Sequence, residues 1–394
     1  MASIESALLT ESCALCNIPW GVSRHSPEHI IPESIGGRKT VTGFICESCN
    51  NDSGGTWDKE LSSQLKSFSA LLGVKRQKGK KPFFDFQTRA GESIRFEVDG
   101  TLSFTGKSTV TDTIDPSKGT GNVSVRARTH GQADKIMEGL KNKYLKMGAK
   151  TVTFSKREST QYFQQQVPIQ TSFGGDFAGK SLVKSVWALA ALSEIEPSSC
   201  EKAYDYLVNG GETCFGYFYS RDLLSSRPAD IIHCVAIKGV PSKGLLLGYV
   251  EYFSVLRVVV CLSENYSGTE FINTYSINPT TAEVLELDVD LNFGAHEIKD
   301  IYDHKYFDND ELKNCLARLS LLSCQRSIKL NLQKYLEQVT KDVCIEYGFD
   351  EEQDLTDEEY MMFCNRIIEL IIPFYERELG LQRKSAMENN DIIE

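Results

Sequence analysis

Two short stretches, Cys13-Ala-Leu-Cys16 and Cys46-Glu-Ser-Cys49, decide the fold at the start of this chain. Each Cys-x-x-Cys turn presents two sulfurs, and the 29 residues between the pairs can close a loop that brings all four sulfurs together. Four thiolates around one tetrahedral Zn²⁺ are a common structural site. The other eight cysteines are scattered singly. The spacing therefore predicts an N-terminal domain that a structural zinc ion holds together, since a core this small is weak on its own.

Between the two pairs lies Glu28-His29-Ile30-Ile31-Pro32, followed by Gly36-Gly37-Arg38-Lys39, and Asn50-Asn51 comes directly after the last cysteine. In this order, the segment from residue 13 to about residue 60 resembles the HNH endonucleases, the zinc-stapled branch of the ββα-metal nucleases. The resemblance implies a small ββα-metal domain. The region beyond residue 83 is loosely similar to the long extension of some stand-alone bacterial HNH proteins, although it carries no motif.

The resemblance also implies roles for individual residues. His29 matches the general base that activates water, and Glu28 and Asn50 match residues that hold one Mg²⁺ or Mn²⁺ ion. Asp58 stands where the family name would place a second His, so it is either a third metal ligand or an acid favoured by a helix N-terminus. These residue types suit phosphodiester hydrolysis, because an imidazole with a pKa near ~6.5 can take a proton from water and a hard cation can neutralise the phosphate.

The charge distribution is uneven. The chain has a net charge of −11, but residues 1–160 carry 23 Lys and Arg against 17 Asp and Glu, a net +6, and residues 161–394 carry −17. A polyanion such as DNA is therefore expected to meet the first half of the chain. Candidate phosphate contacts are Arg38, Lys39, Lys75 and Arg76, whose alternative role is a solvated charged surface.

Hydrophobic patterning beyond the cysteines predicts an α+β protein with antiparallel strands and C-terminal helices. We expect an HNH domain at 1–72, a basic linker at 73–82, a small α+β domain at 83–170, a regulatory, dimerisation or sensor region at 171–383, and a tail at 384–394. Asp99-Gly100 is typical of a hairpin turn, and Thr356 with Glu359 predicts a helix cap.

One motif points elsewhere. Residues Gly174 to Ser181 fit the phosphate-loop pattern of a glycine, four residues and Gly-Lys-Ser. A true phosphate loop follows a buried strand, but the preceding segment is polar and contains Pro168, and no clear partner strand ending in Asp follows. The sequence leaves two interpretations, a nucleotide site and a glycine-rich start of a buried helix.

Residues 1–12 contain Glu5 and Glu11 and no cationic segment followed by a long apolar run, and no later segment approaches about 18 uninterrupted apolar residues. The sequence thus predicts a cytoplasmic protein without a membrane span. The expected function is cleavage of DNA, with RNA as an alternative substrate, in defence against phages or plasmids, by a monomer or a homodimer. Two alternatives stay open: a nuclease gated by a second messenger or protein partner through its C-terminal region, and a non-catalytic zinc-ribbon module that binds nucleic acid.

Overall fold

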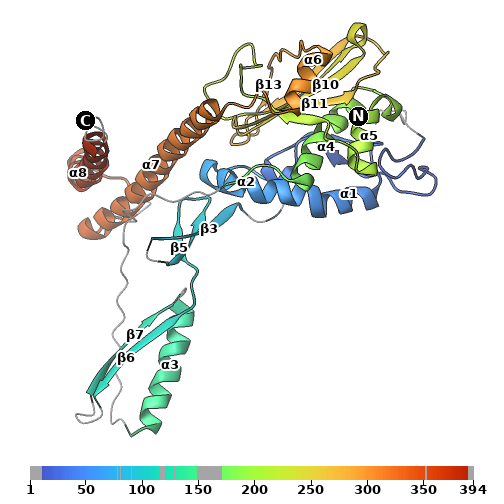
Figure 1. The fold of residues 1–394 in the computed structure, drawn as a ribbon. Coiled ribbons are helices and arrows are strands. Elements are labelled where there is room, and N and C mark those ends of the chain that lie inside the picture. The colour runs from blue at the N-terminus through green and yellow to red at the C-terminus, as the bar shows by residue number, and fades with distance from the viewer. Residues whose placement is uncertain are drawn as a thin grey trace. The chain divides into compact units, whose positions relative to one another are not determined.

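The computed structural model describes residues 11–77, 79, 81–89, 91–115, 120–127, 130–148, 171–350 and 353–388. The chain forms two compact units, Met1–Ser320 and Leu321–Glu394. Helices and antiparallel sheets are mixed along the chain, as Figure 1 shows, which confirms the predicted α+β class. Residues 149–170, which end the predicted 83–170 domain, and residues 389–394 of the predicted tail lie outside the described residues.

The N-terminal elements have the predicted ββα order. Strand β1 (Glu28–His29) pairs antiparallel with β2 (Thr40–Val41), and helix α1 (Glu47–Ser53) follows. A π-helical segment, η2 (Gly54–Asp58), joins α1 to α2 (Lys59–Leu72) without a break. π-Helical insertions are rare and occur often at functional sites.

The loop between β1 and β2 depends on two glycines. A short 3₁₀ turn, η1 (Glu33–Ile35), ends at Gly36, whose φ of 104° disfavours any side chain. At Gly37 an added Cβ would lie 1.7 Å from the carbonyl oxygen of Ile31. The Gly-Gly pair is therefore required for this loop to fold back on itself.

The basic segment after α2 leads into a small sheet. Strands β3 (Phe83–Gln87), β4 (Ser93–Glu97) and β5 (Leu102–Phe104) form an antiparallel sheet whose phenylalanines pack on the end of α2. The turn between β4 and β5 contains Gly100 with a φ of 80°, which confirms the predicted hairpin. A hairpin of β6 (Thr109–Asp115) and β7 (Thr120–Arg126) and helix α3 (His130–Lys146) follow.

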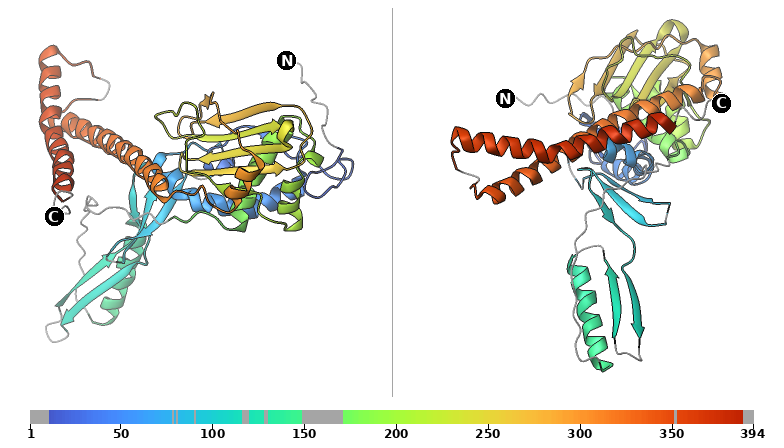
Figure 2. Two further views of the ribbon diagram at one scale, coloured as in Figure 1. Left: turned by 45° about the horizontal axis from the view of Figure 1, so that its top comes forward. Right: turned by 90° about the vertical axis from the view of Figure 1, so that its left-hand side faces the viewer.

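A six-stranded antiparallel sheet forms the largest core, and Figure 2 shows its strands side by side. Its spatial order is β13-β12-β9-β10-β11-β8. The strands are β8 (Phe215–Tyr217), β9 (His233–Val240), β10 (Leu245–Tyr252), β11 (Leu256–Ser263), β12 (Phe271–Ile277) and β13 (Val284–Leu285). Strands β10 and β11 are buried along their whole length, because both faces of the sheet are covered.

Alternate residues of these strands face two different partners. One face packs around helix α6 (Ala295–Tyr302) in a cluster that includes Tyr249 and Ile298. The other face packs on helix α4 (Asp176–Leu192), where Gly248 leaves room for Val186. Helix α4 also contacts η2 and α2, so it connects the sheet to the N-terminal domain. Helix α5 (Glu201–Tyr204) and a π-helical turn (Asp205–Asn209) follow α4.

Two long helices end the chain. Helix α7 (Asn309–Tyr347) extends into the second unit, where it contacts α8 (Asp357–Glu388) through stacked rings of Tyr335 and Phe374. Thr356 and Glu359 exchange hydrogen bonds at the start of α8, which confirms the predicted cap. In the part of the chain that the structure describes, every helix is too short or too polar to cross a membrane.

Candidate active site and zinc cluster

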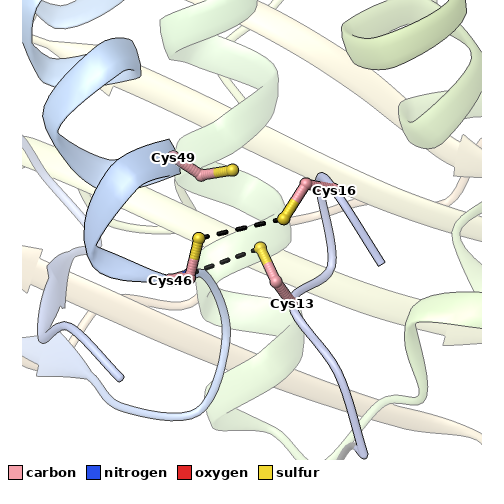
Figure 3. Close-up of side chains that lie close together, drawn as sticks. All are labelled: Cys13, Cys16, Cys46 and Cys49. Carbon is pink, nitrogen blue, oxygen red and sulfur yellow. Dashed lines mark hydrogen bonds between the residues drawn. The ribbon is translucent and has the colours of Figure 1, made fainter. Parts of the chain in front are cut away.

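The four predicted cysteines lie together, and Figure 3 shows their sulfurs pointing toward one another. All four Sγ atoms lie within 4.8 Å of one another, and those of Cys16 and Cys46 are 3.8 Å apart. Zn–S bonds of about 2.3 Å in a tetrahedron place sulfurs about 3.8 Å apart. The backbone N–H of Cys46, at the start of α1, donates to the sulfur of Cys13. The cluster therefore fits a structural zinc ion that joins the first loop to α1.

Three charged side chains meet between the HNH hairpin and α4. The ammonium nitrogen of Lys184 lies 2.6 Å from Glu28 Oε1 and 2.7 Å from Asp58 Oδ2. Lys184 is 1% exposed and Glu28 is 3% exposed, so this contact is almost free of water. Both carboxylates that the sequence singled out as metal ligands thus contact the same nitrogen atom.

Each of these side chains is positioned by a different element. Glu28 comes from β1, Asp58 ends the π-helical segment η2, and Lys184 lies in the middle of α4. Ser181, one turn earlier on α4, donates its hydroxyl to Asp58 Oδ1 at 2.6 Å, and Ser53 accepts a hydrogen bond from Lys184 at 3.3 Å. The two hydroxyl groups thus give hydrogen-bond partners to the second oxygen of Asp58 and to the Lys184 ammonium, as a buried charged group requires.

Burial and charge act on these groups in opposite directions. Burial raises the pKa of Glu28 to about 7, although the Lys184 ammonium opposes this effect. Burial lowers the pKa of Lys184, but the two carboxylates outweigh it and hold that pKa above its usual value. Lys184 therefore carries a positive charge at neutral pH.

His29 follows Glu28 on the same short strand and is half-buried. Successive strand residues face opposite sides, so the two side chains serve one site only near a strand end, and β1 is two residues long. Burial lowers the pKa of His29, while a hydrogen bond with Gln77 and the charges of Glu33 and Asp58 oppose that effect. The imidazole is therefore neutral at pH 7 and able to accept a proton.

Asn50 lies in α1 next to the start of β1. Its amide nitrogen donates to the hydroxyl of Ser26 at 2.8 Å and to the carbonyl of Pro27 at 3.2 Å. These bonds hold the residues directly before Glu28, so Asn50 positions β1. The amide oxygen remains the atom by which Asn50 could bind a metal, and that role stays a prediction.

The four candidate phosphate contacts differ in their exposure to solvent and in their contacts within the protein. Arg38 donates to the carbonyl of Lys75, which ties the β1–β2 loop to the basic segment. Arg76 is half-buried, whereas the side chains of Lys39 and Lys75 are exposed. Lys39 lies 5.7 Å from the ring centre of Tyr275. Their contact with nucleic acid also stays a prediction.

Sequence reasoning missed Lys184 and the role of Ser181, although it singled out the glycine-rich run that contains Ser181. In the structure this run begins α4: Gly174 and Gly175 have positive φ, and Lys180 pairs with Asp176. The serine of the phosphate-loop pattern bonds to Asp58. This arrangement favours the second interpretation, the glycine-rich start of a buried helix.

Residues 13–66 match a family model described as HNH endonuclease. The match contains both cysteine pairs, Glu28, His29 and Asp58, and it confirms an N-terminal HNH domain. No curated protein and no solved structure matches the chain. Helix α4, which supplies Lys184, lies outside the matched segment.

Proposed function

We propose, from the presence of an HNH domain at residues 13–66, that this protein is a metal-dependent endonuclease that hydrolyses DNA phosphodiester bonds, by nicking or by cutting both strands. One observation carries the proposal. The carboxylates of Glu28 and Asp58 converge on one point, and the neutral imidazole of His29 lies next to Glu28 on β1. A nuclease able to act on the DNA of its own cell suits defence against phages or plasmids, which we propose as its setting.

His29 would act as the general base. Its neutral imidazole would take a proton from the attacking water, and Gln77, which bonds the ring, would fix the orientation of the imidazole. A positioned general base contributes about 10²- to 10⁴-fold to a rate. Asn50 would keep the base in place through its bonds to the backbone before β1.

The donor set fits a hard divalent cation. Two carboxylates that reach one point offer the oxygen ligands that Mg²⁺ and Mn²⁺ prefer, and the amide oxygen of Asn50 is a third candidate ligand. When bound, such an ion would stabilise the negative charge that develops on the phosphate and the leaving oxygen. Glu28 and Asp58 are the residues that would hold it.

The exposed lysines on the HNH side of the molecule, Lys39 and Lys75, support binding of a polyanion. Both lie in the half of the chain with a net charge of +6. Phosphate contacts of this kind weaken steeply as salt increases, because binding releases condensed counterions. We therefore propose that the substrate backbone runs along this side of the domain.

Cleavage of a supercoiled plasmid by the zinc-loaded protein tests the proposal. We expect nicked or linear product with Mg²⁺ or Mn²⁺, none with EDTA, and none with Glu28→Gln, which keeps the size of the side chain and one hydrogen-bond acceptor. Absence of cleavage of any DNA or RNA by the wild type with either metal would favour the non-catalytic zinc-ribbon alternative. Cleavage with the metal alone would count against a nuclease that needs a second messenger.

A further inference from the structure

Lys184 is a buried cation at the point where a divalent ion would bind. Its nitrogen contacts Glu28 Oε1 and Asp58 Oδ2, the two oxygens that the proposed function assigns to the metal. Metal–oxygen bonds to Mg²⁺ are about 2.0–2.1 Å long, shorter than the 2.6 and 2.7 Å contacts to the ammonium. An ion that bridged these two oxygens would have to lie close to the point that the ammonium nitrogen occupies, so the two cannot bridge them at the same time.

The surroundings show that the lysine is held at this point. A lysine is almost never fully buried unless it is paired, and Lys184 is 1% exposed with two carboxylates around it. Its helix is fixed from the other side, because Tyr252 on β10 donates to Ser185 and Val186 fills the space above Gly248. A change of partner by this lysine would therefore involve the end of its side chain and not a movement of α4.

The charges of the site also favour replacement of the Lys184 ammonium by a divalent ion. When both carboxyl groups are ionised, two carboxylates and one ammonium sum to a charge of −1, whereas a divalent ion in place of the ammonium would bring the sum of the ion and the carboxylates to zero. Ser181 bonds the other oxygen of Asp58, so this carboxylate keeps one partner when the ammonium leaves. Ser53 is a second acceptor within 3.3 Å of the lysine nitrogen.

We propose that Lys184 is an internal competitor for the catalytic metal: its ammonium occupies the carboxylate pair of the HNH site in the metal-free protein, and divalent ions bind only by displacing it. The inference rests on the proposed function for the identity of the metal site. Lys184 comes from α4, which lies outside residues 13–66. A part of unit 1 beyond the HNH domain would therefore set the metal affinity of the HNH site. A change in α4 would then change nuclease activity through metal occupancy.

Direct measurement of Mn²⁺ binding tests this competition without using activity. The full-length, zinc-loaded protein is titrated with Mn²⁺ while free Mn²⁺ is followed by electron paramagnetic resonance, and zinc content is checked before and after. We expect Lys184→Met to bind Mn²⁺ at least about tenfold more tightly than the wild type, which corresponds to about 1.4 kcal/mol. Lys180→Met is the matched control, because this lysine lies one turn earlier on α4, where it pairs with Asp176 and lies 5.9 Å from the ring centre of Trp57. It should bind Mn²⁺ as the wild type does.

Unchanged or weaker Mn²⁺ binding by Lys184→Met would overturn the proposal and would mean that the lysine only supports the carboxylates. Because Lys184→Met removes the cation from the buried carboxylate of Glu28 and the partly buried carboxylate of Asp58, Lys184→Gln serves as a second variant that keeps hydrogen-bond donors, and the same tightening is expected for it. The double variant Glu28→Gln/Lys184→Met should lose the gain in affinity. If it keeps the gain, the ion binds elsewhere and the proposal is wrong.

Plasmid cleavage separates this inference from the proposed function. Tighter Mn²⁺ binding by Lys184→Met without cleavage by any form of the protein would support the competition and reject the nuclease. Cleavage by the wild type together with unchanged Mn²⁺ affinity in Lys184→Met would support the nuclease and reject the competition.

Discussion

Acidification should destabilise the protein through His233, a fully buried histidine that links β9 to the HNH loop. The backbone N–H of Phe253 donates to its Nδ1 at 3.0 Å, so Nδ1 is unprotonated. Nε2 must then carry the hydrogen and donate to the carbonyl of Ile35 at 2.9 Å. Protonation of Nδ1 would remove an acceptor and place a charge in the core. Burial accordingly lowers the pKa of His233 to about 4.

The sign and size of the effect follow from this shift. In the unfolded chain His233 takes up a proton below about pH 6.5, whereas the folded protein resists it down to about pH 4. The contribution of neutral His233 to the free energy of unfolding is therefore complete above pH 6.5 and is lost as the pH falls toward 4. The total is about 3 kcal/mol, since each pH unit between the two values is worth about 1.4 kcal/mol. Between pH 7.5 and 5.5 the expected loss is about 1.4 kcal/mol.

Urea unfolding at several pH values between 7.5 and 5.5, with zinc content measured at each, checks this prediction. The comparison is with His233→Gln, which keeps a donor near Ile35 and does not titrate. The free energy of unfolding should fall more steeply with acid for the wild type than for the variant, by about 1.4 kcal/mol over this range. Equal pH dependence in the two proteins would refute the reasoning.

Three further substitutions test the N-terminal domain. Cys46→Ser should remove the zinc ion and unfold this domain, seen as loss of zinc by elemental analysis and rapid proteolysis of residues 13–66; a folded, zinc-bound variant would contradict the cluster. Gly37→Ala forces a contact with the carbonyl of Ile31 and should destabilise the domain by about 1–3 kcal/mol in thermal unfolding, whereas an unchanged melting temperature would show that the loop adapts. Asn50→Ala should slow plasmid cleavage and cost about 1–2 kcal/mol of stability while zinc stays bound, and full activity would exclude a positioning role.

Local signals in the sequence were sufficient for the elements whose chemistry is local. The Cys-x-x-Cys spacing predicted the sulfur cluster, Asp99-Gly100 predicted the β4–β5 turn, and Thr356 with Glu359 predicted the α8 cap. Hydrophobic patterning predicted antiparallel strands beyond the cysteines, and the structure places such strands in the large sheet, where β10 and β11 are buried along their whole length. Their spatial order depends on contacts between distant segments and had no such signal.

The part of the site that the sequence did not predict also depends on a contact between distant segments. Lys184 lies 126 residues after Asp58, inside an apolar helix where a lysine alone gives no sign of its partners. The π-helical segment before α2 also had no clear local pattern, although Gly54-Gly55 marks the point where the helix changes its winding. The sequence feature that could have suggested a carboxylate partner is a lysine within an apolar helix, because a lysine is almost never buried unless it is paired.

The rate of DNA cleavage by His29→Ala, measured against pH in the presence of saturating Mg²⁺ or Mn²⁺, tests the central claim most directly. The wild-type rate should rise with pH through the lowered pKa of His29 and level off near neutral pH, because only the neutral imidazole accepts a proton. The variant should keep its zinc and its fold, lose about 10²- to 10⁴-fold in rate, and lose this dependence on pH. Cleavage by His29→Ala at the wild-type rate would contradict the account.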